Sequence, residues 1–303
     1  MSRFWFIALG TLVLASTPLL AAAAPLLYVD NNLPSSTISA VAANGTVSAF
    51  VTGQPYPEGL AIDASGNVYV ANGGVPGTTI SKITPGAGVS TFAAGLNAPE
   101  DLAFDSSGNL CVTVMGAYPA PEAIDKIAPD GTVSPFVTAA QGVSFGYLAC
   151  DNSGNLYTVN AAQNNAILKI TPDGTVSTFA TGINAGGLAC DTSGNLYATS
   201  GSIYKITPSG AISTFVTSST GLYTSSLASD SFGDLYTFAP GGFNASIVEI
   251  SPTGTVSTIA TGLHEPQYIV VAPTPEPASI ALLASAASLL LVRRFRRIPT
   301  TTA

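Results

Sequence analysis

The 303-residue chain contains little charge, and very little positive charge, which excludes one class of partner. Only 9% of its residues are Asp, Glu, Lys or Arg. Residues 25–273 hold four lysines against 16 acidic residues, so their net charge is 4 − 16, or −12. Because binding to nucleic acid needs clustered positive charge, a nucleic-acid partner is excluded. The acidity favours solubility, or weak binding of cations outside the cell.

The chain also has one histidine and three cysteines, which leaves little material for His- or Cys-based catalysis. Cys150 and Cys190 each follow Leu-Ala in two successive repeats, and Cys111 stands where other repeats have tyrosine. Equivalent positions in adjacent repeats are expected to lie too far apart for a disulfide. Since no histidine recurs near them, we expect no nucleophilic cysteine and predict three small buried hydrophobic residues.

The N-terminus has the pattern of a secretory signal peptide. A single basic residue, Arg3, precedes a largely apolar run over residues 4–20, and four alanines follow at residues 21–24. A basic start, a short apolar run and small residues are typical of a segment cleaved during export, here after Ala23 or Ala24. The alternative is an uncleaved membrane anchor, against which the alanine run argues.

A second apolar run covers residues 278–292 and is followed by a cluster of arginines. As a helix this run would span about 22 Å, which is short of the roughly 30 Å hydrocarbon core of a bilayer. Flanking arginines that snorkel would hold such a helix in a membrane, with the arginines in the cytoplasm and the preceding domain outside. The run therefore predicts a short membrane-inserted helix. It is preceded by Pro275, Glu276 and Pro277 and followed by Arg293, Arg294, Arg296 and Arg297.

The order of Pro-Glu-Pro, short apolar helix and terminal arginines resembles the PEP-CTERM sorting signal. The resemblance implies transient insertion into the inner membrane, cleavage by an exosortase-like enzyme, and transfer to the cell surface or extracellular matrix. It also implies an association with exopolysaccharide or biofilm, which the rest of the sequence does not indicate. A plain single-span anchor is the alternative.

Between the two ends the sequence repeats itself. A segment with the pattern Leu-Ala-x-Asp-x-x-Gly-Asn-Leu-Tyr recurs, and its aspartates are separated by 42, 46, 40 and 39 residues. A second segment, Ile-x-Lys-Ile-x-Pro followed by Val-Ser-Thr-Phe, recurs between the copies of the first. Such a period indicates a repeat architecture. The aspartates of the first segment are Asp63, Asp105, Asp151, Asp191 and Asp230.

Each repeat contains four short β-type runs, and long helical patterns are absent. Ser-Gly-Asn between the first two runs, and Asp-Gly or Asn-Gly between the last two, predict tight hairpins because Gly and Asn tolerate left-handed conformations. Four antiparallel strands in each repeat are typical of a β-propeller blade. Residues 27–31 match a second strand that lacks its first, and residues 268–272 match a first strand that lacks its second. We expect these to pair and complete a sixth blade, which removes two exposed sheet edges.

The repeat strings resemble NHL repeats, and they also resemble the propellers of the SMP-30/gluconolactonase and virginiamycin B lyase families. The resemblance covers nearly all of residues 27–272. It implies an all-β, six-bladed β-propeller with four-stranded blades over residues 25–273, between a signal peptide (1–24) and a sorting tail with a transmembrane helix (274–303). Because propellers host many activities, the resemblance leaves the function open.

Candidate site residues lie in the loops that precede each Leu-Ala strand. Resemblance to the lactonases implies a divalent metal held there by acidic and amide side chains, and resemblance to the lyases implies a metal with a catalytic histidine. Since the motifs of neither family are matched residue by residue, we assign no catalytic residue and no cofactor. The candidate ligands of a divalent cation are Glu58 and Glu100, in matching Pro-Glu contexts, with His264 and Glu265, and with Asn97, Asn184 and Gln267 as further polar residues.

The repeated polar positions are interpreted as structural. Each repeat aspartate stands three residues before a turn glycine, where it can accept backbone hydrogen bonds that brace the hairpin; calcium binding is the alternative. We expect the lysines to lie on blade surfaces or to contact other blades, and the tyrosines to pack between blades. The lysines are Lys82, Lys126, Lys169 and Lys205, and the tyrosines are Tyr69, Tyr157, Tyr197 and Tyr236.

Two functions from different classes therefore remain. The first is a monomeric, non-enzymatic propeller at the cell surface or in the matrix, which binds exopolysaccharide or surface proteins. The second is a metal-dependent lactonase or lyase. A stoichiometric metal bound tightly in the channel would favour the enzyme.

Overall fold

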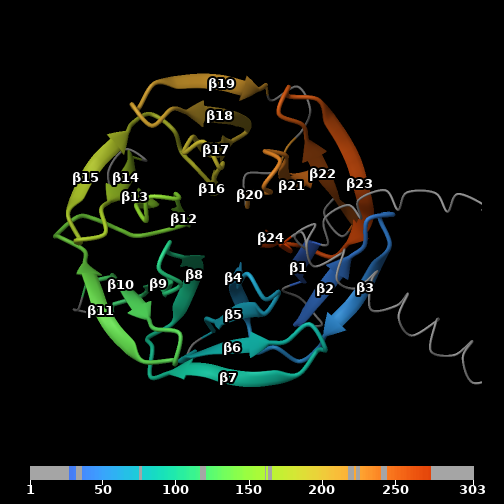
Figure 1. The fold of residues 1–303 in the computed structure, drawn as a ribbon, viewed down its shortest axis with the longest axis horizontal. Coiled ribbons are helices and arrows are strands. Elements are labelled where there is room, and N and C mark those ends of the chain that lie inside the picture. The colour runs from blue at the N-terminus through green and yellow to red at the C-terminus, as the bar shows by residue number, and fades with distance from the viewer. Residues whose placement is uncertain are drawn as a thin grey trace, which may run out of the picture.

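The computed structural model describes residues 27–31, 36–74, 77–116, 121–160, 162, 166–217, 222, 226–239 and 244–273. Within these residues the chain forms 24 strands and no α-helix. The strands make six four-stranded antiparallel sheets that surround a central axis (Figure 1). The predicted all-β, six-bladed propeller is thereby confirmed.

Each blade contains four strands that follow one another from the centre of the ring to its rim. Blade 1 consists of β24 (Ile269–Val271), β1 (Leu27–Asn31), β2 (Thr37–Val41) and β3 (Val47–Val51). Blade 2 consists of β4 (Pro57–Ile62), β5 (Val68–Asn72), β6 (Thr79–Ile83) and β7 (Val89–Ala94), and blade 3 of β8 (Pro99–Phe104), β9 (Leu110–Val114), β10 (Ala123–Ile127) and β11 (Val133–Thr138). Blade 4 consists of β12 (Leu148–Cys150), β13 (Leu156–Asn160), β14 (Ala166–Ile170) and β15 (Val176–Ala180), and blade 5 of β16 (Leu188–Cys190), β17 (Leu196–Ser200), β18 (Ser202–Ile206) and β19 (Ile212–Val216). Blade 6 consists of β20 (Ala228–Ser229), β21 (Leu235–Ala239), β22 (Ala245–Ile250) and β23 (Val256–Leu263).

The hairpin between the first and second strands of blades 2–6 is braced as the sequence predicts. In blade 2, Asp63 Oδ1 accepts hydrogen bonds from the backbone N–H groups of Ser65 and Asn67, both at 2.9 Å. The Asn67 side-chain amide donates to Asp63 Oδ2 at 2.7 Å. The glycine of the turn, Gly66, has a φ of 78°, which other residues rarely adopt. The same backbone bonds recur at Asp105, Asp151, Asp191 and Asp230.

The repeat tyrosines and lysines join this network within their own blade. The Tyr69 hydroxyl donates to Asp63 Oδ2 at 3.1 Å, and Lys82 Nζ lies 5.3 Å from the centre of the tyrosine ring. In blade 3, Cys111 replaces the tyrosine, and Lys126 there forms an ion pair with Asp105 at 3.2 Å. The other three lysines are cross-strand partners of tyrosines, in the pairs Tyr69–Lys82, Tyr157–Lys169 and Tyr197–Lys205.

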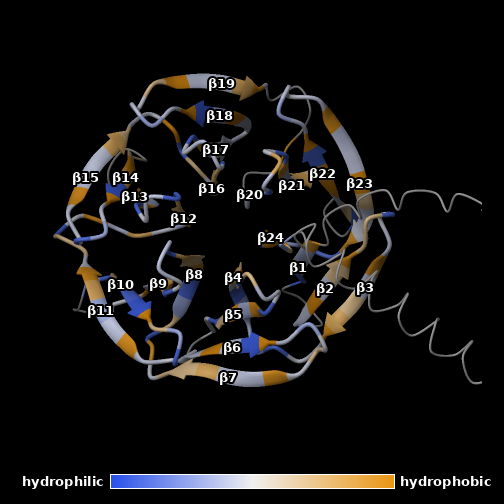
Figure 2. Cartoon of the chain, in the orientation of Figure 1, coloured by the Kyte–Doolittle hydropathy of each residue, from blue (hydrophilic) through white to orange (hydrophobic). Residues whose placement is uncertain are grey.

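The hydrophobic core lies between blades, and one cluster of buried side chains fills each of the six interfaces. The Tyr69 ring, for example, packs edge-on against Phe92 of its own blade and Phe104 of the next, with centroid distances of 4.9 and 5.1 Å. This confirms the predicted packing of that tyrosine between blades. Figure 2 shows hydrophobic residues distributed over strands of every blade around the ring.

The ring is closed by the two ends of the propeller, as predicted. β1 pairs with β24, so Leu27, Tyr28 and Val29 lie opposite Val271, Val270 and Ile269. Asp30 adds a side-chain clamp, because its Oδ1 accepts hydrogen bonds from the backbone N–H groups of Gln267 and Tyr268 at 3.0 and 2.6 Å. The blade that the sequence leaves split is therefore held by both backbone and side-chain bonds.

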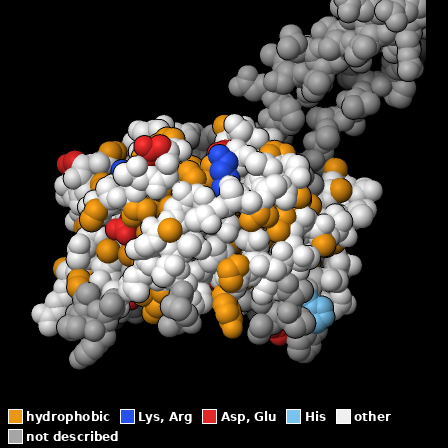
Figure 3. All heavy atoms as spheres, turned by 90° about the horizontal axis from the view of Figure 1, so that it is seen from below, with side chains coloured by type: hydrophobic (Ala, Val, Ile, Leu, Met, Phe, Trp, Pro, Cys, Tyr) orange, Lys and Arg blue, Asp and Glu red, His pale blue; other side chains and the backbone are white. Residues whose placement is uncertain are grey.

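The predicted signal peptide and sorting motif, including Pro275, Glu276, Pro277 and the four tail arginines, lie outside the described residues. Among the residues that the structure does describe, no helix has the length and apolar character needed to cross a bilayer. Seen from the side (Figure 3), the visible face carries few charged side chains, in keeping with the composition.

Candidate functional site

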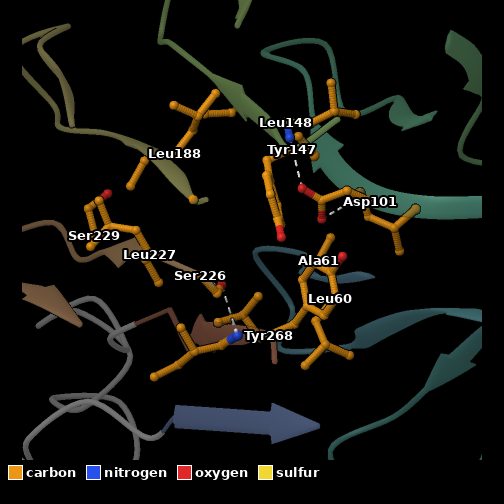
Figure 4. Close-up of a pocket in the computed structure, with 18 of the residues that line it drawn as sticks. Leu60, Ala61, Asp101, Tyr147, Leu148, Leu188, Ser226, Leu227, Ser229 and Tyr268 are labelled. Carbon is orange, nitrogen blue, oxygen red and sulfur yellow. Dashed lines mark hydrogen bonds between the residues drawn. The ribbon is translucent and has the colours of Figure 1, made fainter. Parts of the chain in front are cut away.

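A cavity of about 320 Å³ occupies the centre of the ring and is lined by the first strands of all six blades (Figure 4). We call the end of the cavity at which these first strands begin the mouth. The pairing of first with second strands defines one equivalent position in each blade. In blade 6 this position directly precedes β20. The residues are Leu60, Leu102, Leu148, Leu188, Leu227 and Ile269.

The residue directly before this position differs from blade to blade in an ordered way. Around the ring it is glycine, then a hydrogen-bond acceptor, then tyrosine, and the same three types follow again. Blades separated by half a turn therefore carry the same type. From blade 2 round to blade 1 the residues are Gly59, Asp101, Tyr147, Gly187, Ser226 and Tyr268.

The glycines and acceptors hold neighbouring blades together. A Cβ atom on Gly59 would lie 2.4 Å from the Glu100 carbonyl oxygen, so only glycine lets blade 3 approach this closely. Asp101 Oδ2 accepts a hydrogen bond from Leu148 N of blade 4 at 2.8 Å. Ser226 Oγ plays the same part towards Ile269 N of blade 1, at 3.3 Å.

The two tyrosines cross the channel. Tyr147 and Tyr268 come from opposite blades, yet their ring centroids are 6.2 Å apart with an angle of 44° between the rings. Both side chains are half-buried, and Figure 4 shows the Tyr147 ring extending into the cavity beside Asp101. The two rings therefore meet across the channel at the mouth, and we call this pair the aromatic floor.

Glu58 and Glu100 occupy matching positions at the mouth, as their sequence contexts predict. Each is the second residue of a first strand and follows a proline. The residues before these prolines, Tyr56 and Ala98, have positive φ values of 46° and 40°. A left-handed residue before proline is unfavourable, and such strain is found most often at functional sites. The turn recurs at Glu265 of blade 1, with a φ of 44°.

The carboxyl groups at the mouth have raised pKa values, chiefly because they are buried. Burial raises the pKa of Asp30 to about 8, with a further contribution from the charge of Glu58. Burial also raises the pKa of Asp101 to about 7, although hydrogen bonds from Leu148 N and Leu102 N oppose it. The pKa of Glu58 is raised by burial, and that of Glu100 by burial and by the charges of Glu122 and Glu58.

The same charges act on the aromatic floor. Burial raises the pKa of Tyr147, and the neighbouring charges of Asp101, Glu100 and Glu58 raise it further. Burial raises the pKa of Tyr268 in the same way, with contributions from Asp101, Glu58 and Asp30. Both phenols are therefore neutral at physiological pH, and four carboxyl groups surround them.

The four predicted cation ligands do not form one cluster. Glu58 and Glu100 share the mouth, whereas His264 and Glu265 are exposed in the turn between β23 and β24. Within the described ranges, no group of three His, Cys, Asp or Glu side chains is placed to hold one metal ion. Glu58 with Glu100 is therefore the part of the predicted set that the structure brings together.

The three cysteines are free thiols, as predicted, but two of them are only half-buried. Cys150 and Cys190 line the central cavity, since each follows the Leu-Ala pair of a first strand. Burial raises the pKa of Cys111 and Cys150 to about 12, and it raises that of Cys190 as well. These residues are thiols and not thiolates at physiological pH, so they are poor nucleophiles.

Sequence reasoning missed Asp30, Asp101, Tyr147 and Tyr268. The signal for three of them was present, because they stand one residue before the equivalent Leu or Ile of the first strands. Aligning the six copies at that position gives the order glycine, acceptor, tyrosine twice over. Asp30 had a different signal, since it is an acidic residue that directly follows the apolar run of residues 27–29.

No protein-family profile and no curated protein sequence matches the chain. Solved structures do match it. Virginiamycin B lyase from Staphylococcus aureus is 18% identical with a TM-score of 0.54, over 78% of this chain and 84% of that chain. A gluconolactonase from Xanthomonas campestris is 14% identical with a TM-score of 0.56, over 84% and 90%.

A chain of a nidogen/laminin complex is also similar, with 18% identity and a TM-score of 0.66, over 82% of this chain and 98% of that chain. At these identities the matches show the fold and not the activity. The propeller fold is thus shared with a lyase, with a lactonase and with a protein in a complex with another. The resemblance seen in the repeat strings is confirmed for the fold.

Proposed function

We propose that this protein is an exported propeller that binds a ligand at the mouth of its channel and acts as a binding or structural module at the cell surface or in the extracellular matrix. The mouth carries the aromatic floor of Tyr147 and Tyr268, and Glu58 and Glu100 stand at the same end of the ring. Export and sorting rest on the two sequence ends, which predict a signal peptide and an exosortase-processed tail. Exopolysaccharide and surface proteins are the partners that the sorting-tail resemblance suggests.

The observation that supports this proposal is the set of contacts that the residues of the mouth make. The Asp30 and Asp101 side chains accept backbone hydrogen bonds that join strands and blades, and Tyr147 and Tyr268 meet across the channel. Acid–base or nucleophilic catalysis needs a base within hydrogen-bond reach of the group it activates. Here the two buried aspartates are committed to holding the ring, which favours recognition over turnover.

The topology also suits presentation from a membrane or matrix. β24 begins at the mouth and runs away from it, so Pro273, the last described residue, follows on the opposite side of the ring. A C-terminal tail that starts there would leave the mouth facing away from its attachment point. A binding module needs this orientation if its ligand is outside the cell.

The competing function, a metal-dependent lactonase or lyase, is tested by a turnover assay. The purified full chain in mild detergent is incubated with sugar lactones and with the cyclic depsipeptide quinupristin, each in the presence of Mg²⁺, Ca²⁺, Mn²⁺ or Zn²⁺. We expect no turnover above the metal-only background, and we expect His264→Ala to change stability by no more than about 0.5 kcal/mol, as is usual for an exposed residue. Metal-dependent turnover that is lost in His264→Ala would overturn the binding function.

Processing of the tail is tested separately. If residues 275–297 are a sorting signal, the mature surface protein should lack the peptide from Leu282 to Arg297 when it is examined by mass spectrometry. Replacing Pro275 and Pro277 by alanine should leave the tail attached and the protein in the membrane fraction. Intact tails on most wild-type surface molecules would mean that the segment is a plain anchor.

A further inference from the structure

The mouth combines three features that are not explained by contacts between blades. Its floor is a pair of phenol rings, Tyr147 and Tyr268, with centroids 6.2 Å apart. Glu58 and Glu100 of blades 2 and 3 stand at the same end of the ring, and both are half-buried. In blades 4 and 5 the positions equivalent to these glutamates are Gly146 and Gly186. The mouth is therefore acidic on the side of blades 2 and 3 and carries no acidic residue at the equivalent positions of blades 4 and 5.

A second observation, independent of the glutamates, points to a missing positive partner. Asp30 is fully buried, and its Oδ1 accepts hydrogen bonds from Gln267 N and Tyr268 N, but its Oδ2 has no hydrogen-bond partner. This carboxyl group lies beneath the turn that carries Tyr268 and is close enough to Glu58 for the two charges to interact. A buried carboxylate oxygen without a donor is unfavourable unless it keeps a proton or faces a cation.

The arrangement of the carboxyl groups indicates which type of cation fits the mouth. A small divalent ion needs several oxygen ligands that converge on one point at about 2.0–2.6 Å. The described residues offer no group of three acidic, His or Cys side chains so placed. The fields of Asp30, Glu58, Glu100 and Asp101 act instead on the two tyrosines. Aromatic faces with surrounding carboxylates bind large, weakly hydrated cations, of which alkylammonium groups are the best known.

We propose that the mouth binds an organic cation, with a quaternary or alkylated ammonium group resting on the Tyr147–Tyr268 pair and facing the carboxylates of Glu58 and Glu100. The proposal rests on the binding function above and names the chemical class of its ligand. The ammonium group supplies a positive charge opposite the glutamate carboxylates, and its field also acts on the buried carboxyl group of Asp30, which is within electrostatic range of Glu58. Gly146 and Gly186 add no side chain at the equivalent positions of blades 4 and 5, and the rest of the ligand would extend over these two blades.

The test compares two probes of the same shape that differ in charge. Choline carries a trimethylammonium group, and 3,3-dimethyl-1-butanol replaces its nitrogen by carbon. Isothermal titration calorimetry on the full chain in detergent at pH 8.5 should show choline binding at least tenfold more tightly than the neutral alcohol. Equal affinity for the two probes would overturn the proposal, because the site would then recognise shape without charge.

Variants assign the binding to the mouth. Glu58→Gln should weaken choline binding at least fivefold and leave the neutral alcohol unchanged. Tyr147→Leu should weaken it to a similar degree, whereas Tyr147→Phe, which keeps the ring, should restore it. Asp130→Asn removes an exposed carboxylate in a hairpin away from the mouth and should have no effect. Equal loss in Glu58→Gln and Asp130→Asn would show that choline binds through net charge alone.

Two further outcomes are distinguishable. If Ca²⁺ or Mg²⁺ binds in a one-to-one ratio and displaces choline competitively through Glu58 and Glu100, the mouth is an inorganic cation site and the proposal fails. If choline does not bind and the turnover assay is also negative, the ligand class is wrong while the binding function stands. Should Tyr147→Leu not fold, the wild-type comparison of choline with its isostere and the Glu58→Gln variant still decide the question.

Discussion

Removing residues 25–31 should destroy the cooperative unfolding of the propeller or lower its melting temperature by on the order of 15 °C. The deletion takes away β1, whose side chains Leu27, Tyr28 and Val29 are exposed by 1%, 5% and 0%. Burying each such side chain contributes about 2 kcal/mol, hence about 6 kcal/mol together. That is a large part of the 5–15 kcal/mol that stabilises a typical domain, and each kcal/mol is worth about 2–4 °C in a domain of this size.

The effect should be greater than the side chains alone suggest. β1 lies between β24 and β2, so its loss leaves unpaired backbone groups on both of its neighbours. It also removes Asp30 and with it the bonds to Gln267 and Tyr268. An opened ring exposes strand edges that can pair with other molecules, so we expect aggregation as well as instability. Differential scanning calorimetry and light scattering measure the two consequences.

A cross-link provides the opposite perturbation. Leu27→Cys combined with Val271→Cys places cysteines on directly paired residues of the two ends. If closure limits stability, the oxidised double variant should melt at a higher temperature than its reduced form. A deletion variant that melts like the full chain and stays monomeric would show that β1 is dispensable for closing the ring.

Features that the sequence repeats were predictable, because several copies report the same local physics. The aspartate of each hairpin and the turn glycine recur in five repeats, and each turn can be derived from local chemistry alone. The count of six blades follows from the strand types, including the unmatched residues 27–31 and 268–272. Closure then follows because sheet edges that can pair do so.

Features that distinguish one repeat from another were not predictable to the same extent. Tyr147 and Tyr268 are 121 residues apart in sequence, and only the curvature of the ring brings blades 4 and 1 face to face across the channel. The pairing of Lys126 with Asp105, in place of a lysine over a tyrosine, depends on the presence of Cys111 in that blade. The spatial relation of the candidate cation ligands was equally hidden, since His264 and Glu265 stand in the turn before β24 whereas Glu58 and Glu100 lie within the first strands of blades 2 and 3.

The stability of the propeller should fall as the pH rises from about 5 to 8. Asp30 has a pKa of about 8 and Asp101 a pKa of about 7, in both cases raised mainly by burial, whereas an unfolded aspartate titrates near 3.8. An acid whose pKa is higher in the folded state binds its proton more tightly there, so protonation favours folding. This contribution is fully present below pH 3.8 and is lost as the pH rises to the folded-state pKa. In that window each group should lower the free energy of unfolding by about 1.4 kcal/mol for each unit by which the pH rises.

Asp30→Asn should remove the Asp30 part of this dependence. The asparagine Oδ1 can still accept the hydrogen bonds of Gln267 N and Tyr268 N, and its neutral amide stands in for the protonated carboxyl group. We therefore expect the wild type and the variant to have similar melting temperatures near pH 5, and the variant to melt several degrees higher at pH 8. Differential scanning calorimetry at half-unit intervals from pH 5 to 9 measures both slopes.

The control distinguishes this effect from general repulsion in an acidic domain. Asp130 is exposed, and the hydrogen bond from Thr132 N lowers its pKa, so Asp130→Asn removes one negative charge without touching a group that titrates between pH 5 and 8. If repulsion among the 16 acidic residues of 25–273 caused the decline, both variants would flatten it equally. A steeper slope in the wild type than in Asp30→Asn, with Asp130→Asn unchanged, assigns the decline to the buried carboxyl group that closes the ring. Identical slopes in the wild type and Asp30→Asn would mean that Asp30 does not release its proton between pH 5 and 8, and that the decline has another cause.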